Sequence, residues 1–443
     1  MERMQDMCVV GSGITAGALV WVLARYGGVK RVVMCERRGD FALVNSHPRS
    51  NSHTPHTGEI ESFYTKERAL FVKERTELLL GYVSRFAPGA LVPMHKQLLG
   101  VGEEEVEIVT RRFNDLREHY PDIRLLDRKG IEQVEPRLMD GRVLNESVAS
   151  LFTARGGAID FRRVAKSFLE GARSTQTKID VRFDMSVKAI ERTSDGFLVR
   201  TGPSSIRART VVVCAGSASL LFAHRMGLGK NLVLFPVMGN FYRVQGALNG
   251  KVYTVQGNPK IPFVSLHADP AVYDPEETRI GPTTSLTCFL EQGSWKSALE
   301  FLRSGTLTPR GMYGLARTIS DTDLFGFGLK QALYEIPLIG KERLAHDVRK
   351  IIPAVRADDL QFDRGAGGVR GQPIDLDTGR MAVGAEKIVA PHDPIIFTMS
   401  PSPGGSCCIG SAIEDARHVV SWLGEPYRFD EDRLRSELVY SGS

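Results

Sequence analysis

The stretch that decides the fold is Met7-Cys8-Val9-Val10-Gly11-Ser12-Gly13-Ile14-Thr15-Ala16-Gly17, near the start of the chain. A short apolar run, two glycines and then an apolar helical pattern predict a strand, a tight turn and a helix whose N-terminus can face a pyrophosphate. Gly11 permits the turn, Gly13 lets the backbone approach phosphates, and Ala16 lets the helix and the strand pack closely. The stretch therefore predicts a site for an adenine dinucleotide.

Other strand ends are expected to meet the same ligand. Glu36 follows a second apolar run, 25 residues after Gly11, and is placed to accept hydrogen bonds from the adenosine ribose. Ala215-Gly216 and Gly404-Gly405-Ser406 each follow a later apolar run. Several remote turns on one long dinucleotide favour FAD over a nicotinamide cofactor. A helix starting at Gly405 would direct its dipole at the isoalloxazine ring.

Charge and cysteine content narrow the class of protein. The 57 basic and 52 acidic residues give a net charge of +5, which argues against a dedicated nucleic-acid binder and leaves room for weak attraction to anionic substrates or membrane surfaces. No apolar run reaches the roughly 18 residues needed to span a bilayer, so membrane contact is expected to be peripheral. The six cysteines show no metal-ligand spacing, and no metal site is predicted. A first strand beginning so early leaves no room for a signal peptide, so we expect a cytoplasmic protein, or one docked on the cytoplasmic face of a membrane.

The order of elements predicts an α/β protein in which a Rossmann-type FAD-binding domain, of the glutathione-reductase and D-amino-acid-oxidase kind, carries an inserted antiparallel-sheet substrate domain. Apolar segments between residues 232 and 290 predict separate strands of the inserted sheet, at residues 234–237, 241–244, 252–255 and 263–266, and mostly helical patterns follow to residue 350. We assign residues 1–90, 146–230 and 351–443 to the FAD-binding domain, residues 91–145 to a helical excursion that forms part of the cap, and residues 231–350 to the substrate domain.

Six motifs together resemble the malate:quinone oxidoreductases, which are FAD flavoproteins of the D-amino-acid-oxidase-like group. They are Gly11-x-Gly13-x-x-Ala16, His56-x-Gly58, Phe235-Pro236-Val237-x-Gly239, His267-x-Asp269, Gly281-Pro282 and Ser400-Pro401-Ser402-Pro403-Gly404. The resemblance implies oxidation of an L-2-hydroxy dicarboxylate, most of all malate to oxaloacetate, with electrons passed to a quinone. An L-2-hydroxyglutarate or other 2-hydroxy-acid dehydrogenase or oxidase of the same group is the nearest alternative. A non-catalytic FAD-binding protein is the alternative of another class.

This chemistry requires a base for the hydroxyl proton and cations for the carboxylates. We expect His267 to be the base, because Asp269 beside it could fix its tautomer and raise its basicity. His56 is the rival base and otherwise a cofactor or substrate contact, since its loop, with Ser52, is expected at the flavin. Arg370 is the first candidate for carboxylate binding because glycines flank it.

Three further expectations complete the predicted site. Arg279 and Arg243 are secondary candidates for substrate binding, and the FAD is expected to be noncovalent. The apolar stretch Leu324-Phe325-Gly326-Phe327-Gly328-Leu329 is a candidate quinone entrance or membrane-docking edge. In related enzymes an arginine often follows the His-x-Asp motif, whereas this chain has Pro270-Ala271, which leaves the exact hydroxy acid open.

Overall fold

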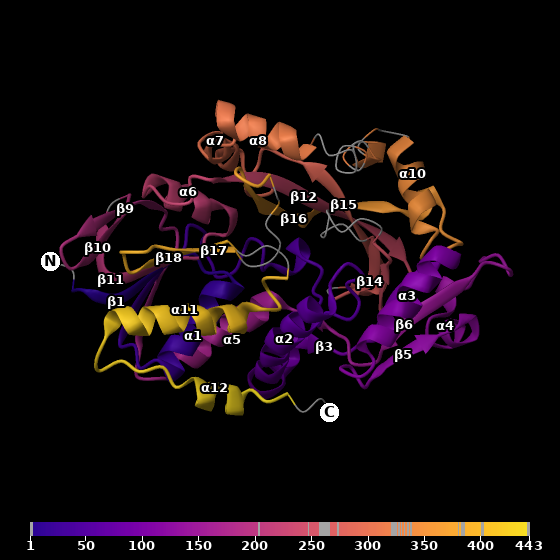
Figure 1. The fold of residues 1–443 in the computed structure, drawn as a ribbon, viewed down its shortest axis with the longest axis horizontal. Coiled ribbons are helices and arrows are strands. Elements are labelled where there is room, and N and C mark those ends of the chain that lie inside the picture. The colour runs from indigo at the N-terminus through magenta and orange to yellow at the C-terminus, as the bar shows by residue number, and fades with distance from the viewer. Residues whose placement is uncertain are drawn as a thin grey trace.

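In the part of the chain that the structure describes, two eight-stranded sheets organise the fold, as the computed structural model shows (Figure 1). The structure describes residues 3–202, 204–246, 248–256, 266–272, 274–319, 339–379, 386–399 and 403–440, together with residues 326, 328, 330, 331, 333, 334, 336 and 381.

The first sheet carries the predicted dinucleotide fold, in the strand order β17-β18-β11-β1-β2-β8. All neighbours in this order are parallel except β17 and β18, and the hairpin of β9 and β10 extends from β11, with Thr193 opposite Gly196. The central strands are apolar on both faces because helices and loops cover both sides. The strands span Gln5–Val10 (β1), Arg31–Cys35 (β2), Lys178–Arg182 (β8), Val187–Thr193 (β9), Gly196–Thr201 (β10), Ser205–Val213 (β11), Glu386–Val389 (β17) and Ile395–Met399 (β18).

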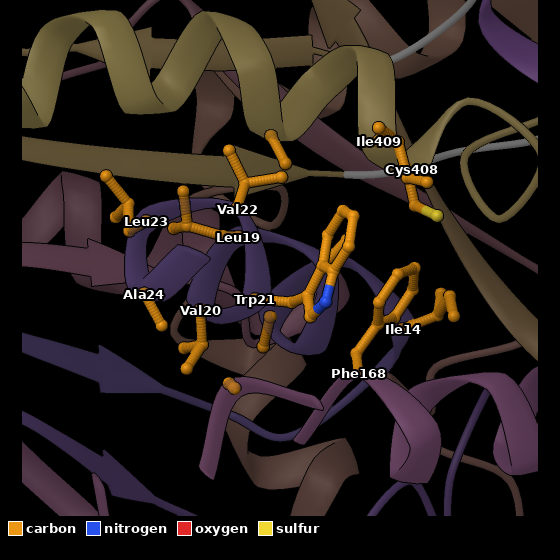
Figure 2. Close-up of a cluster of buried hydrophobic side chains, with 14 of the residues drawn as sticks. Ile14, Leu19, Val20, Trp21, Val22, Leu23, Ala24, Phe168, Cys408 and Ile409 are labelled. Atoms are coloured by element: carbon orange, nitrogen blue, oxygen red, sulfur yellow. The ribbon is translucent and has the colours of Figure 1, made fainter. Parts of the chain in front are cut away.

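Helices α1, α5, α11 and α2 build the core on one side of this sheet (Figure 1). Trp21 of α1 stands at its centre and meets the rings of Tyr26 and Tyr82 edge-on at centroid distances of 5.3 and 4.7 Å. Figure 2 shows Phe168 of α5 and Ile409 of α11 near the same tryptophan. Buried between α5 and α11, α1 is apolar nearly all round, which explains its continuous apolar sequence. The helices span Ile14–Tyr26 (α1), Lys66–Phe86 (α2), Phe161–Arg173 (α5), Cys408–Leu423 (α11) and Glu431–Glu437 (α12).

The second sheet has the strand order β16-β12-β15-β14-β13-β4-β6-β5. Its neighbours are antiparallel except for β13 and β4, which run parallel. Figure 1 shows α7 and α8 at its upper edge beside β12 and β16. The strands span Lys96–Val101 (β4), Ile123–Leu126 (β5), Val148–Thr153 (β6), Leu232–Gln245 (β12), Lys251–Thr254 (β13), His267–Ala271 (β14), Asp274–Leu286 (β15) and Gln361–Asp375 (β16).

The remaining elements connect or cover the sheets. Leu91–Val92 (β3) and Ala158–Ile159 (β7) form a small two-stranded sheet. The other helices span Glu103–Leu116 (α3), Arg128–Val134 (α4), Ser219–Arg225 (α6), Trp295–Leu302 (α7), Pro309–Ile319 (α8) and Ile339–Val348 (α10), with 3-10 turns at Pro48–Ser50, Pro88–Ala90, Pro136–Leu138, Gly216–Ala218 and Ala357–Asp359. None of the helices described here is long and apolar enough to cross a membrane.

The sheet pairing corrects the predicted content of two segments. Residues 91–145 are not only helical, because they contribute β4 and β5 to the second sheet, and β16 joins that sheet from residues 351–443. In β4 the buried Lys96 and Gln97 hid the strand pattern, and in β16 four glycines did so. The apolar segments 234–237 and 241–244 belong to one long strand, β12, rather than to two. The domain boundaries themselves stay a prediction.

Some expected features lie outside the described residues. They are residues 263–265 of an expected strand, Ser400 to Ser402 of the C-terminal motif, and Leu324, Phe325, Phe327 and Leu329 of the apolar stretch.

Candidate active site

A cavity of about 530 Å³ lies at the carboxyl ends of β1, β2, β11 and β18 and extends to Gly368 and Arg370 of β16. Ligands of open parallel sheets bind at this end of the strands, and the volume is that of a typical cofactor or ligand site. The first sheet and its turns thus provide one wall, and a strand of the second sheet provides another. The predicted residues that line the cavity are Gly11, Gly13, Glu36, Ser52, His56, Ala215, Gly216, Arg370, Gly404, Gly405 and Ser406.

The turn after β1 has the backbone that a pyrophosphate requires. Gly11 has a φ of +105°, and a Cβ there would overlap the carbonyl oxygen of Cys214, so only glycine fits. Helix α1 begins directly afterwards with Gly13 as its N-cap residue, and Ser46 Oγ accepts a hydrogen bond from the N–H of Ile14 in its first turn at 3.0 Å. Ala16 is fully buried in α1, as its predicted packing role requires. An anion at this helix N-terminus fits the residues present.

Glu36 stands at the end of β2 with its carboxylate at the cavity wall. Ser12 Oγ donates to Oε2 of Glu36 at 2.6 Å, and the backbone N–H of Arg38 donates to Oε1 at 2.8 Å. These bonds fix the carboxylate beside the phosphate-binding turn, where an adenosine ribose would lie. The turn after β1, the start of α1 and the carboxylate of Glu36 therefore fit the ADP half of FAD.

The other end of the cavity joins the C-terminal turn to the loop of residues 51–61. Ser406 Oγ accepts a hydrogen bond from the backbone N–H of His56 at 3.0 Å and donates to the carbonyl of Thr54 at 3.2 Å. The helix expected from Gly405 begins instead at Cys408, because a turn closed by the N–H of Cys407 and the carbonyl of Pro403 precedes it. Ser406 therefore couples this turn directly to the histidine loop.

His56 lines the cavity and has a carboxylate partner behind it. Its Nδ1 lies 2.5 Å from Oε1 of Glu61, a buried residue. Burial alone raises the pKa of Glu61, but the hydrogen bond with His56 and the charges of Lys96 and Arg112 lower it overall. Because Glu61 is ionised, Nδ1 of His56 carries the proton and donates it to the carboxylate. This tautomer leaves Nε2 of His56 as the acceptor nitrogen.

Arg370 is half-buried on β16 and lines the same cavity. A Cβ at Gly371 would overlap the side chain of Ser217, so glycine is what lets this strand approach the cofactor turn, as its sequence predicts. Burial lowers the pKa of the Arg370 guanidinium. A carboxylate bound in the cavity would offset this cost of burial.

His267 lies behind this wall. Its buried ring stacks on Tyr253, with centroids 4.6 Å apart and planes 17° apart, and the rings of Tyr253 and His56 meet edge-on with centroids 6.4 Å apart. Nε2 of His267 is 3.7 Å from Oδ1 of Asp269, which exceeds the length of a hydrogen bond. The expected hydrogen bond by which Asp269 would fix the His267 tautomer is therefore absent from this pair.

Asp269 is held by two cations instead. Nζ of Lys251 and Nη2 of Arg279 each lie 3.0 Å from its Oδ2, and all three side chains are fully buried. Burial raises the pKa of Asp269, but the charges of Arg279 and Lys251 outweigh it and hold this pKa well below the usual range. Arg279 also donates to the carbonyl of Asn51 at 2.8 Å. Within the described part of the chain, the cavity lining includes neither Asp269, Arg279 nor His267.

Arg243 is a member of a separate ion pair. Its Nη1 lies 2.9 Å from Oε2 of Glu277, on the neighbouring strand β15, and it is absent from the described lining of the cavity. The structure thus brings Arg370 and His56 together and leaves Arg243 elsewhere on the second sheet. In the described ranges, no group of three histidine, cysteine or acidic residues is arranged to hold a metal ion.

Sequence reasoning missed four residues next to this site, and the first is Glu61, the carboxylate partner of His56. Lys96 and Lys251 are buried under the loop of residues 51–61, and the ring of Tyr253 contacts the rings of both His56 and His267. The signal that could have identified the lysines is a single charge at the start of each apolar run, in Lys96-Gln97-Leu98-Leu99 and in Lys251-Val252-Tyr253.

Comparison with known proteins defines the class first. Residues 6–386 match the family DAO, FAD dependent oxidoreductase, so the chain belongs to this class of flavoenzymes. The chain is 34% identical over 446 residues to a probable malate:quinone oxidoreductase of Campylobacter jejuni, covering 98% of this chain and 99% of the relative. It is 32% identical over 452 residues to malate:quinone oxidoreductase of Helicobacter pylori, covering 99% and 100%. The chain therefore belongs to the malate:quinone oxidoreductase family.

Solved structures agree on the fold. Glycine oxidase of Geobacillus kaustophilus superposes with a TM-score of 0.63 at 16% identity, covering 99% of this chain and 98% of that one. L-amino acid deaminase of Proteus myxofaciens gives a TM-score of 0.64 at 15% identity, covering 95% and 91%. The predicted fold class, family and FAD cofactor are confirmed.

Proposed function

We propose that this chain oxidises L-malate to oxaloacetate with FAD and passes the electrons to a quinone. The observation that carries the proposal is that His56 and Arg370 face the same cavity as the dinucleotide-binding turns. Bound FAD supplies the oxidant that accepts the hydride from C2 of the hydroxy acid. The turn at Gly11 and the start of α1 hold the pyrophosphate, and Glu36 holds the ribose. Ser52, Ala215, Gly216 and Gly404 to Ser406 surround the rest of the cofactor.

Arg370 binds a carboxylate of the substrate. Its guanidinium is planar and always charged, so it can hold a carboxylate by two parallel hydrogen bonds. Its place on β16, paired with Val237 of β12 and close against the cofactor turn, fixes the substrate relative to the cofactor. Orientation of this kind accounts for a large part of rate enhancement in two-substrate reactions.

His56 accepts the hydroxyl proton on Nε2. Glu61 holds the opposite nitrogen as a donor at 2.5 Å and stabilises the imidazolium that forms. This geometry favours His56 over His267 as the base, because His56 lines the cavity and His267, stacked on Tyr253, is not part of its described lining. We propose that His267, with Asp269 and Arg279, supports the wall of the cavity.

The FAD is held noncovalently. Among the described residues that line the cavity, His56 is the histidine, and its Nδ1 is engaged by Glu61. Cys35 and Cys214 also line the cavity; Cys35 is buried, and burial raises the pKa of the Cys214 thiol, which disfavours its nucleophilic thiolate. Acid precipitation should therefore release all of the flavin into the supernatant, and flavin remaining with the pellet would contradict noncovalent binding.

The deciding experiment is the absorption spectrum of the purified holoprotein without oxygen. L-Malate should bleach the flavin, and a soluble quinone analogue should restore its colour. L-2-Hydroxyglutarate, lactate and D-amino acids serve as competing substrates. Bleaching by L-2-hydroxyglutarate alone would support the alternative substrate, and bleaching by amino acids alone would reject the proposal. Bound FAD that responds to none of them would indicate a non-catalytic flavoprotein.

We propose further that helices α7 and α8 dock the protein on an anionic membrane surface. Trp295 and Leu299 on α7 are 79% and 59% exposed, and Tyr313 on α8 is 71% exposed. Exposed basic residues occur on and between the same two helices, namely Lys296, Arg303, Arg310 and Arg317, and Arg303 also lines the cavity, so the surface adjoins the site. An apolar and aromatic surface with a basic rim is complementary to anionic lipid headgroups. A lipid-soluble quinone would then reach the cavity from the bilayer.

Vesicle sedimentation tests this surface. Vesicles of phosphatidylcholine with phosphatidylglycerol should bind the holoprotein, and pure phosphatidylcholine or high salt should bind it less. Trp295→Ser with Leu299→Ser should abolish binding. Val143→Ser with Leu144→Ser, an equally exposed apolar pair elsewhere on the surface, should leave it unchanged. Equal binding by both double variants would reject docking through α7 and α8. Docking on the cytoplasmic face of the membrane stays part of the proposal, and it is supported by six cysteines that are all free of disulfide bonds.

A further inference from the structure

Two buried lysines stand side by side under the loop of residues 51–61. Lys96 of β4 and Lys251 of β13 are direct partners in the parallel pairing of the two strands, and both side chains are fully buried. Like charges opposite each other on neighbouring strands repel, and each buried ammonium loses its hydration. Burial accordingly lowers the pKa of Lys251 to about 8. Such an arrangement requires compensating contacts.

Those contacts converge on the loop that carries His56. Nζ of Lys251 donates to the carbonyl of Ser52 at 2.8 Å, and Nζ of Lys96 donates to the carbonyl of Pro55 at 3.2 Å. The two lysines thus hold the backbone on both sides of residues 53 and 54, and Pro55 directly precedes His56. Each lysine also has its own counter-ion, Asp269 at 3.0 Å for Lys251 and Glu59 at 2.7 Å for Lys96.

The loop between these two anchors is strained. His53 adopts a φ of +57°, a left-handed conformation that is unfavourable for a residue with a Cβ. Its ring is fully buried, and burial lowers the pKa of His53 to about 3, so it adds no third charge beside the lysines. A strained segment keeps its conformation only when surrounding contacts hold it. The two lysine-to-carbonyl hydrogen bonds are such contacts.

We propose that Lys96 and Lys251 are positioning residues that fix the loop of residues 51–61 and thereby hold His56 at the cavity. The inference rests on the proposed role of His56 as proton acceptor. The proposal gives a function to the parallel pairing of β13 and β4. These strands come from residues 231–350 and 91–145, and they meet beneath the loop of residues 51–61. The lysines act through backbone carbonyls and do not touch the substrate.

Two variants remove one ammonium each without leaving a carboxylate unpaired. Lys251→Met leaves Asp269 paired with Arg279 at 3.0 Å. Lys96→Met is combined with Glu59→Gln, which makes that pair neutral. The matched control, Arg142→Met with Glu146→Gln, removes another buried cation, which donates to the carbonyls of Leu138 and Lys350 at 2.7 and 2.8 Å, away from the cavity.

Hydrogen–deuterium exchange of the purified holoproteins measures directly how well the backbone of residues 51–61 is held in place. Both lysine variants should raise the exchange rate of peptides covering residues 51–61 at least tenfold, with FAD content retained, and the control should not. Reduction of the flavin by malate should slow by about 10- to 100-fold, as misplacement of a reacting group predicts. Unchanged exchange in residues 51–61 would overturn the inference, whatever the activity.

A double-mutant cycle separates positioning from general destabilisation. If the lysines act through His56, then adding Lys251→Met to His56→Gln should cause no further loss of reduction rate. Additive losses would overturn the inference. A His56→Gln variant that reduces its flavin at the wild-type rate would instead reject the proposed role of His56, and the exchange measurement would still decide whether the lysines hold the loop.

Discussion

Gly11→Ala tests the turn on which the cofactor site depends. The φ of +105° at this position is costly for alanine, by about 1–3 kcal/mol. The added Cβ would overlap the carbonyl oxygen of Cys214, and overpacking of this kind costs about 1–3 kcal/mol more. We therefore expect a loss of about 2–6 kcal/mol, which is a large fraction of the roughly 5–15 kcal/mol that stabilises a typical protein. The displaced backbone would also close the approach to the pyrophosphate.

Gly28→Ala is the matched control, because Gly28 has a φ of +65° but no neighbouring atom within 4 Å of an added Cβ. It should lose only the conformational part, about 1–2 kcal/mol, and retain FAD. Urea unfolding of the apoproteins followed by circular dichroism measures the difference in stability, and flavin absorbance per chain measures cofactor content. Equal stability of the two variants, with full FAD content in Gly11→Ala, would refute the proposed steric role of the turn.

Three further predictions concern charge. Glu61→Gln replaces a charge-assisted hydrogen bond to His56 with a neutral one, which costs about 1–2 kcal/mol. Flavin reduction by malate, measured by stopped flow, should therefore slow by about 5- to 30-fold with FAD retained. An unchanged rate would contradict the proposed role of the His56–Glu61 pair. Arg370→Lys keeps the positive charge but loses the planar guanidinium that can donate two parallel hydrogen bonds to a carboxylate. The Kd for malate, measured from the substrate dependence of flavin reduction, should therefore rise about tenfold or more. An unchanged Kd would mean that the substrate carboxylate binds elsewhere. Burial raises the pKa of Glu135 from 4.5 to about 7, so its contribution to stability is complete below about pH 4.5 and is lost as the pH rises through 7. As the pH rises from 4.5 to 8, the free energy of unfolding of Glu135→Gln, measured with urea, should therefore increase by about 3 kcal/mol relative to that of the native chain. A difference between the two proteins that does not change with pH would contradict the raised pKa of Glu135.

The cofactor end of the site could be predicted because its determinants are local. Gly11, Gly13 and Glu36 lie within one β-α-β unit, where spacing along the chain determines position in space. Ala215 and Gly404 were also recognised, since each follows an apolar run that could only be a strand of the same sheet. At parallel strand ends, sequence order is enough to bring remote residues to one ligand.

The substrate end could not be predicted in the same way. Asp269 stands two positions from His267, and this spacing predicts a pair. In the structure the carboxylate of Asp269 instead forms ion pairs with Lys251 and Arg279 on the two neighbouring strands. Glu61, the partner that His56 does have, was visible in the sequence but carried no periodic signal. Pairing among buried charges depends on which strands are neighbours and in which register, and sequence spacing does not contain this information.

The same reasoning explains why β4 was missed and why it matters. A buried strand that begins with a lysine and a glutamine contradicts the apolar pattern by which strands are recognised. Local rules of this kind are broken mainly where function requires it, because an unfavourable buried charge is retained only when it does something that an apolar residue cannot. Lys96 meets this criterion, since no apolar side chain could donate to the carbonyl of Pro55 beside the proposed base. Departures from the apolar pattern in predicted core strands are therefore the places in this chain where sequence analysis should look for residues that support the site.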